Sequence, residues 1–180
     1  MKIFKRIALV LLSVIVLLLI IAAFIDGKYA IEKSVIIQQP QSVVYEYVKY
    51  VKNQDNFSVW NQRDPNMKKS YRGTDGEIGF IYAWESKDEH VGTGEQEIIG
   101  LVPNDSVKFQ LRFKIPFETQ DNAYLCVHAI DSTQSEVKWG FQGEFPYPFT
   151  LMKVALSMED AVGKDLGKGL ENLKKVLEKK

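Results

Sequence analysis

The sequence predicts an α+β domain in which a curved antiparallel sheet of about seven strands wraps around one long C-terminal helix. Segments with strand-like alternation follow one another without intervening helices, which argues against a parallel doubly wound sheet. The last segment instead carries apolar residues at steps of three or four, which is the spacing of one helix face. An apolar run near the N-terminus predicts a transmembrane helix before this domain.

The N-terminal apolar run, residues 7–25, predicts a membrane anchor. Ser13 is its only polar residue, and a helix of this length spans roughly 28 Å, close to the ~30 Å hydrocarbon core of a bilayer. By the positive-inside rule we expect a single pass through the cytoplasmic membrane, with the N-terminus inside and the domain extracytoplasmic. Residues 1–27 then form the cytoplasmic tip and anchor, and residues 28–180 form the domain. The basic residues that set this orientation are Lys2, Lys5 and Arg6.

A cleaved signal peptide is the alternative for the same run. The charged start fits a signal peptide, and the small pair Ala22-Ala23 offers a weak cleavage site. The run is, however, longer than the roughly 7–15 apolar residues usual for the core of a signal peptide. The anchor is therefore the favoured interpretation, and the cleaved form stays open.

The charge of the remaining chain limits its partners. Three of the 23 basic residues lie before residue 26, so residues 26–180 contain 20 basic and 23 acidic residues and carry a net charge of −3. Because nucleic-acid binding needs a basic face, we expect no nucleic-acid partner. Cys126 is the single cysteine, which excludes an internal disulfide, and its apolar neighbours are typical of a packing role.

The order of the predicted elements follows from periodicity and turn signals. A strand from Tyr29 to Gln38 precedes a helix that opens at Pro40 and runs to about Lys52, because proline lacks the amide that the first helical turn leaves unpaired. Turn signals such as Gly73-Thr74-Asp75-Gly76 separate the later strands. These strands are expected at residues 68–72, 77–86, 92–102, 106–114, 122–131 and 136–144.

The apolar faces of the sheet and of the last helix are expected to pack on each other. From Val107 to Phe113, apolar residues alternate with charged or amide side chains, as in an antiparallel strand with one solvated face. A helix predicted from Leu151 to Leu177 presents a continuous apolar stripe to that face. Within it, Gly163 and Gly167 flatten one strip and allow a close approach, at a cost of roughly 1 kcal/mol each relative to alanine.

Short motifs distributed over residues 29–177 carry a resemblance to a known group. With the order of elements, they resemble the helix-grip fold of the START/polyketide cyclase (SRPBCC) superfamily, and most of all its bacterial polyketide cyclase/dehydrase-like proteins with an N-terminal hydrophobic segment. The resemblance implies a cavity between sheet and helix that accepts lipids, polyketides or other apolar molecules, and it implies no catalytic residue. The motifs are Trp60 with Asp64-Pro65-Asn66-Met67, Tyr82-Ala83-Trp84-Glu85, Gly92-Thr93-Gly94, Trp139-Gly140-Phe141 with Gly143, Gly163-Lys164-Asp165-Leu166, and Gly169-Leu170-Glu171-Asn172-Leu173-Lys174.

Large apolar side chains are the candidates for lining such a cavity. Aromatic rings supply apolar contact, and a tyrosine hydroxyl or indole N–H orients the polar end of a ligand, a role expected here of Tyr82 and Trp84. Core packing is the alternative role for each candidate. The predicted lining residues are Tyr82, Trp84, Phe109, Trp139, Phe141 and Met158.

Neither a catalytic nor a metal-ligating constellation stands out in the sequence. The chain lacks a nucleophile elbow, a phosphate-cradling glycine loop and a Cys-x-x-Cys motif, so no cofactor is expected. The two histidines, His90 and His128, lie in different elements without partners at metal-ligand spacing, so no metal site is expected. An enzyme would draw on Glu95, Asp64 or His128 for proton transfer, although solvated-sheet and turn roles explain these residues more simply.

Three functional hypotheses follow from the sequence. The preferred one is a membrane-tethered extracytoplasmic module that binds an apolar or amphipathic small molecule, lipid or polyketide-like. A domain held at the bilayer meets membrane-partitioned compounds at high local concentration, which favours this hypothesis. The alternatives are a polyketide cyclase/hydrolase-like enzyme with titratable side chains in the cavity, and a protein-interaction module with a collapsed pocket.

Overall fold

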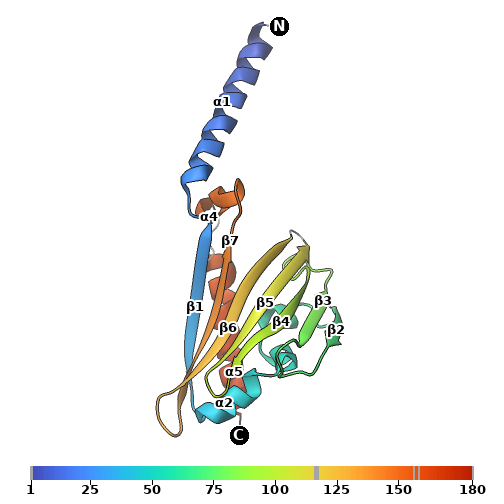
Figure 1. Ribbon diagram of the computed structural model, residues 1–180, viewed down its shortest axis with the longest axis vertical. Coiled ribbons are helices and arrows are strands. Elements are labelled where there is room, and N and C mark those ends of the chain that lie inside the picture. The colour runs from blue at the N-terminus through green and yellow to red at the C-terminus, as the bar shows by residue number, and fades with distance from the viewer. Residues whose placement is uncertain (1, 116–117, 156, 158, 180) are drawn as a thin grey trace.

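The described part of the chain contains an apolar N-terminal helix followed by an antiparallel sheet with covering helices. The computed structural model describes residues 2–115, 118–155, 157 and 159–179. The helix α1 (Lys2–Phe24) projects away from the domain (Figure 1). It is long and apolar enough to cross a membrane, a property that it shares with signal sequences. Among its described residues only Ala22 is buried, so the apolar surface of α1 has no protein cover.

The domain is built on a seven-stranded antiparallel sheet with the strand order β1-β7-β6-β5-β4-β3-β2. The first strand pairs with the last, with Lys28 opposite Glu144, and the other neighbours are consecutive in sequence. The predicted antiparallel sheet is therefore confirmed, although β3 begins later than expected because Gly76 and Gly79 adopt φ values of 85° and 88°, outside the strand region. The strands are β1 (Lys28–Ile37), β2 (Lys68–Arg72), β3 (Ile81–Glu85), β4 (Thr93–Val102), β5 (Ser106–Ile115), β6 (Thr119–Ala129) and β7 (Ser135–Glu144).

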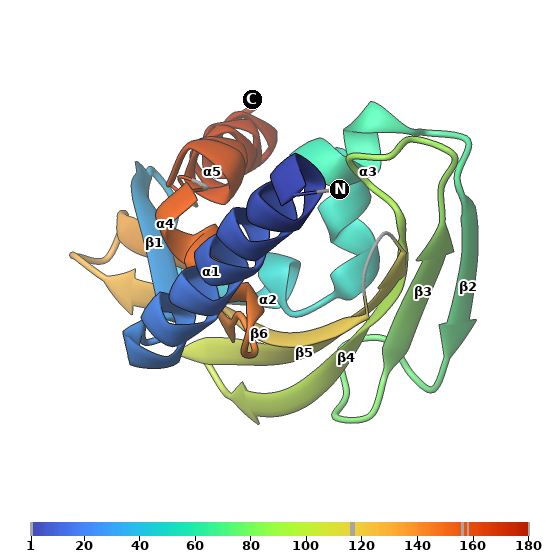
Figure 2. The ribbon, with the colours of Figure 1, turned by 90° about the horizontal axis from the view of Figure 1, so that it is seen from above.

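Helices cover the concave face of the curved sheet (Figure 2). The C-terminal helix α5 (Lys164–Leu177) packs against β1 and β7, and its Leu166, Leu170 and Leu173 are fully buried. A sheet that holds the C-terminal helix in this way is the helix-grip fold, so the predicted α+β architecture is confirmed. The other covering elements are α2 (Gln41–Val48), the 3₁₀ helix η1 (Val51–Asn56) and α3 (Val59–Arg63).

The helix predicted from Pro40 to Lys52 is wrong in its second half. α2 ends at Val48, and η1 starts a new helical segment. Asp75, in the turn between β2 and β3, accepts hydrogen bonds from the backbone N–H groups of Val51 at 2.8 Å and Lys52 at 3.2 Å. The carboxylate of Asp75 thus satisfies the free backbone amides at the start of η1. Because Asp75 is distant in sequence, local periodicity does not reveal this break.

The continuous helix predicted from Leu151 to Leu177 is also wrong in its first half. The segment divides into the 3₁₀ turn η2 (Phe149–Leu151), α4 (Met152–Ala155), the π-helical turn η3 (Glu159–Gly163) and α5. η2 contacts α1, whereas α5 packs on the sheet. The two halves have different packing partners, so one apolar period does not produce one helix.

A close approach of the kind predicted at Gly163 and Gly167 occurs at Gly169, whereas Gly167 has none. A methyl group at Gly169 would lie 2.7 Å from the indole ring of Trp139. At Gly167 the nearest neighbouring atom, the Cγ of Lys33, is 3.9 Å away, which leaves ordinary contact distance. The absence of a side chain at Gly169 therefore lets α5 lie directly on the tryptophan of β7.

Candidate ligand-binding pocket

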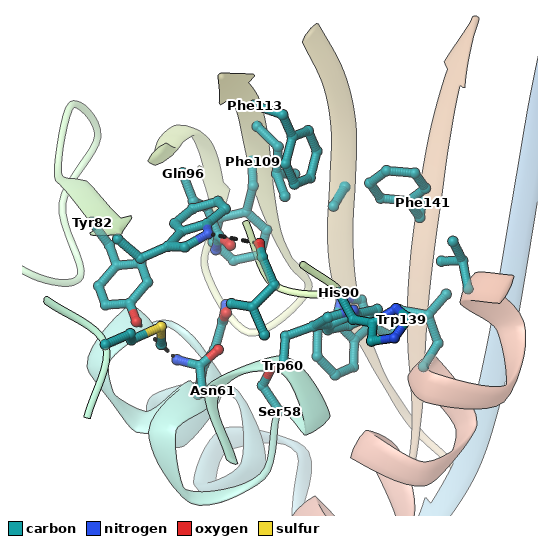
Figure 3. Close-up of a pocket in the computed structure, with 18 residues that line it drawn as sticks. Ser58, Trp60, Asn61, Tyr82, His90, Gln96, Phe109, Phe113, Trp139 and Phe141 are labelled. Atoms are coloured by element: carbon teal, nitrogen blue, oxygen red, sulfur yellow. Dashed lines mark hydrogen bonds between the residues drawn. The ribbon is translucent and has the colours of Figure 1, made fainter. Parts of the chain in front are cut away.

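A cavity of about 160 Å³ lies between the concave face of the sheet and the helices α3 and α5 (Figure 3). The sequence-predicted residues Tyr82, Trp84, Phe109, Trp139 and Phe141 line it, and their contact with a ligand stays a prediction. Met158 lies outside the described residues. The further lining residues are Gln54, Ser58, Trp60, Asn61, Met67, His90, Val91, Gln96, Leu111, Phe113, Ala123, Val162 and Leu166.

Phe, Tyr and Trp side chains make up seven of the eighteen described lining residues. Tyr82 stacks on Trp84 with centroids 5.9 Å apart and an interplanar angle of 26°, and Phe113 meets Trp84 edge-on at 5.9 Å. Trp60 and Trp139 meet edge-to-face at 6.0 Å. All three tryptophans of the chain line the cavity, so the intrinsic fluorescence of the protein reports on what the cavity contains.

The loop between β3 and β4 closes one side of the cavity. The indole N–H of Trp84 donates a hydrogen bond to the carbonyl oxygen of Val91 at 3.2 Å, which holds the loop against the ring. The side chain of Val91 is buried there, and His90 is exposed beside it. Trp84 therefore uses its polar atom to fix the wall, rather than leaving it free for a ligand as the sequence suggested.

Uncharged polar side chains interrupt the aromatic wall. Gln96 is only 7% exposed, and its Nε2 has no hydrogen-bond partner among the described residues. The Asn61 amide donates to the Tyr82 hydroxyl at 3.1 Å, and burial raises the pKa of Tyr82, which keeps the phenol neutral. Among the described lining residues there is no Asp, Glu, Lys or Arg. The cavity thus suits an uncharged, largely apolar group that carries one hydrogen-bond acceptor for Gln96.

The concave face is sealed at one end and open at the other. Val127, at the far end, is fully buried where α2 packs on β6. Along β5 the exposed fraction rises from 1% at Phe109 to 58% at Ile115, and the two positions between them on this face are half-buried. The pairings through β6 and β7 place the last residues of β5 at the same end of the sheet as the first residues of β1. The cavity therefore opens toward the end of the sheet at which α1 joins the domain.

Glu95, one of the predicted proton-transfer residues, lies on the convex face, away from the cavity. It accepts hydrogen bonds from Arg112 at 2.7 Å and from Arg72 at 3.0 Å. The hydrogen bond from Arg112 holds the pKa of Glu95 below its usual range. Arg112 also donates to Glu97 at 2.8 Å, so these charges form a cluster across β2, β4 and β5.

The other predicted titratable residues are also absent from the cavity wall. Asp64 accepts a hydrogen bond from the Ser86 hydroxyl at 2.6 Å and acts as a turn residue, as its position before a proline suggests. His128 is exposed on β6, 3.9 Å from Asp105. The structure does not bring Glu95, Asp64 and His128 together. Within the described part of the chain, no group of three or more His, Cys, Asp and Glu side chains is placed to hold a metal ion.

Three of the further lining residues, Leu111, Phe113 and Gln96, lie at positions that the sequence pattern identifies. Leu111 and Phe113 share the alternation of Phe109, so the pattern that identified one identifies all three. Gln96 lies between Glu95 and Glu97, whose solvated positions place residue 96 on the opposite, concave face. An amide on the predicted buried face was therefore a usable signal for a polar group in the cavity.

Comparison with known proteins establishes the fold of the domain. No protein-family model and no curated protein sequence matches the chain. Truncated norcoclaurine synthase from Thalictrum flavum is similar over 86% of this chain and 97% of its own, with 13% identity and a TM-score of 0.59. A Thermobifida fusca protein is similar over 82% of this chain and 92% of its own, with 18% identity and a TM-score of 0.56.

A third solved structure extends the same similarity. The Aha1 dimer from Colwellia psychrerythraea contains a chain that is similar over 83% of this chain and 96% of its own length, with 16% identity and a TM-score of 0.51. At such low identity these similarities show the fold alone. They agree with the helix-grip fold that the sequence motifs imply.

Proposed function

We propose that this chain is a membrane-tethered, extracytoplasmic module that binds an apolar or amphipathic small molecule, lipid or polyketide-like, in the cavity between sheet and C-terminal helix. The observation that carries the proposal is a cavity lined by aromatic rings, with no Asp, Glu, Lys or Arg among its described lining residues and with one buried amide N–H that lacks a partner. Apolar walls with a few placed polar groups are the usual composition of small-molecule sites.

The size of the cavity limits what enters it. Its volume of about 160 Å³ is below the roughly 300–1,000 Å³ of pockets that enclose a drug-sized ligand. An apolar cavity of about 150 Å³ holds a single benzene ring. We therefore expect one ring or a short acyl segment to insert, while the rest of a longer ligand lies along the half-exposed Leu111 and Phe113.

The unpartnered amide of Gln96 specifies the chemistry of the inserted part. A buried N–H group without a partner costs about 1–3 kcal/mol, and a ligand oxygen placed against it recovers this free energy. The inserted part of the ligand thus carries a carbonyl, hydroxyl or ether oxygen. A pure hydrocarbon leaves the Gln96 Nε2 unsatisfied and binds more weakly.

The tether rests on α1. Its length and composition suit a membrane span, and the basic residues Lys2, Lys5 and Arg6 favour a cytoplasmic N-terminus. An extracytoplasmic domain held in this way meets lipids and membrane-partitioned compounds at high local concentration. Because of this concentration, a small pocket of modest affinity is sufficient for occupancy.

Replacement of Gln96 by leucine tests the proposal. Gln96→Leu removes the unpartnered amide, so we expect the free energy of unfolding to rise by about 1 kcal/mol. The same change lowers the affinity for an oxygen-bearing amphipath, such as a medium-chain fatty alcohol, by roughly tenfold because one hydrogen bond is lost. Both effects are measured on the full-length protein in detergent micelles, by thermal unfolding and by titration of tryptophan emission.

Gln142→Leu is the matched control, because Gln142 is exposed on β7 and does not line the cavity. We expect it to change neither stability nor affinity. If Gln96→Leu stabilised the protein and left the affinity for the alcohol unchanged, the ligand would not contact Gln96, and the proposed site would be wrong.

A further inference from the structure

The base of α1 is held by a segment far from it in sequence, residues 145–154, here called the collar. The hydroxyl of Thr150 donates a hydrogen bond to the carbonyl oxygen of Ala22 at 2.6 Å, and both residues are buried. The ammonium group of Lys153 donates to the carbonyl oxygen of Asp26 at 2.9 Å. The N–H of Phe145 donates to Gly27 at 3.1 Å. The collar therefore holds the last turn of α1 through Ala22, and it holds the link between α1 and β1 through Asp26 and Gly27.

These contacts set the depth of the collar relative to a membrane that contains α1. Ala22 belongs to the last turn of the apolar run, and a helix from Ile3 to Phe24 spans roughly 33 Å, slightly more than the ~30 Å hydrocarbon core. Thr150 contacts Ala22 directly, so the collar lies at the level where α1 leaves the hydrocarbon. This level is the bilayer interface.

The exposed side chains of the collar suit that interface. Tyr147, Phe149 and Val154 are each more than half exposed, and the basic Lys153 lies among them. Aromatic and basic side chains favour the headgroup region, where rings are partly buried and ammonium groups meet anionic lipids. Figure 1 shows α4 at the foot of α1, beside the ends of β1 and β7.

We propose that the collar rests in the interface of the bilayer that holds α1, so that the open end of the cavity faces the lipid. This inference rests on the proposed membrane tether. The cavity opens toward the end of the sheet at which α1 joins the domain. The view along the long axis shows α1 crossing over the concave side of the sheet (Figure 2). A ligand then passes between the bilayer and the half-exposed Leu111 and Phe113 without crossing bulk water.

Depth measurements on the full-length protein test this inference. Single cysteines are introduced at Phe149→Cys and Val154→Cys in a Cys126→Ser background, labelled with an environment-sensitive fluorophore, and reconstituted in phosphatidylcholine–phosphatidylglycerol vesicles. Matched controls are Ile130→Cys, in the turn between β6 and β7, and Ile78→Cys, in the segment between β2 and β3, both at the end of the sheet away from α1. The native side chains are comparably exposed, at 57% for Phe149 against 50% for Ile130, and at 74% for Val154 against 65% for Ile78.

We expect bromolipids to quench the labels at positions 149 and 154, and aqueous iodide to quench the labels at 78 and 130. A collar buried about 5–10 Å into the headgroup boundary gives this division. If iodide quenches positions 149 and 154 as well as it quenches 78 and 130, the collar does not touch the membrane.

A label at Leu12→Cys separates this failure from failure of the tether. Leu12 lies in the middle of α1 and is exposed. If bromolipids quench the label at Leu12→Cys while iodide reaches positions 149 and 154, the tether stands but the placement of the collar in the bilayer interface is wrong. Iodide access at Leu12→Cys overturns both the tether and the inference that rests on it.

Discussion

The two ends of the concave face are built from the same strands but differ in what covers them. At the sealed end, Val107, Leu125 and Val127 are fully buried where α2 and the sheet meet. At the open end, Leu111 and Phe113 are half-exposed and line the cavity. Both ends show the same apolar alternation. Their difference teaches that alternation selects a face, whereas the covering helices decide whether that face packs as core or lines a site.

A matched pair of leucine truncations gives the largest expected contrast between the two ends. Leu125→Ala leaves a hole in the sealed end, so we expect the free energy of unfolding to fall by about 3 kcal/mol. Leu111→Ala removes a half-exposed side chain, with an expected loss of about 1 kcal/mol. Thermal unfolding of the full-length protein in detergent, followed by tryptophan emission, measures both.

Ligand affinity distinguishes the same two variants in the opposite order. We expect Leu111→Ala to weaken binding, because Leu111 lines the cavity, and Leu125→Ala to leave the affinity of the folded fraction unchanged. Equal losses of stability in the two variants would show that the open end is packed as tightly as the sealed end. That result would contradict the proposed difference between the two ends of the concave face.

Two glycines of α5 provide the next contrast. Gly169→Ala places a methyl group 2.7 Å from Trp139, which must shift at a cost of about 1–2 kcal/mol. Gly167→Ala meets no close neighbour and gains helix propensity, so we expect a stabilisation of roughly 0.5–1 kcal/mol. Chemical denaturation of both variants checks the opposite signs. A stabilising Gly169→Ala would mean that α5 does not lie against the wall of the cavity.

The charge cluster behind the open end gives the smallest expected effect, and it depends on pH. The pKa of Glu95 is lowered in the fold, so its stabilisation is present above the ordinary value of 4.5 and is lost as the pH falls through the folded value. We expect Glu95→Gln to cost about 1 kcal/mol at neutral pH, since the partly exposed pair is screened by solvent, and to cost progressively less as the pH falls through the lowered pKa of Glu95.

The control for this pH dependence is Glu85→Gln, which removes a solvent-exposed pair with Lys68 at 3.3 Å. We expect it to leave stability nearly unchanged at every pH. Unfolding curves recorded between pH 7 and pH 3 compare the two variants. A Glu95→Gln penalty that grows as the pH falls would contradict the assigned direction of the pKa.

The same comparison shows how much of this molecule the sequence predicts. Alternation and helical spacing are local, so the antiparallel sheet and α5 follow from them, and the concave position of Phe109 follows as well. The break at Val48 depends on Asp75, and the division of the C-terminal segment depends on contacts with α1. Such partners are distant in sequence, and no local period reports them.

The cavity also depends on contacts between residues that are distant in sequence, so local patterns do not predict it. Tyr82 and Trp139 are large, aromatic and buried, and the same is true of Phe57 and Phe80, which do not line the cavity. Which of these rings borders empty space depends on where α2, α3 and α5 sit. The unpaired state of Gln96 likewise emerges only when all of its neighbours are in place.

Native mass spectrometry of the full-length protein, released from membranes in a mild detergent, tests the central claim most directly. We predict an additional mass, close to one equivalent per chain, that organic extraction identifies as an oxygen-bearing lipid or polyketide-like compound. An unoccupied mass, with tryptophan emission unchanged after exposure to a total membrane lipid extract, would contradict the binding function. That result would favour a protein partner for the domain.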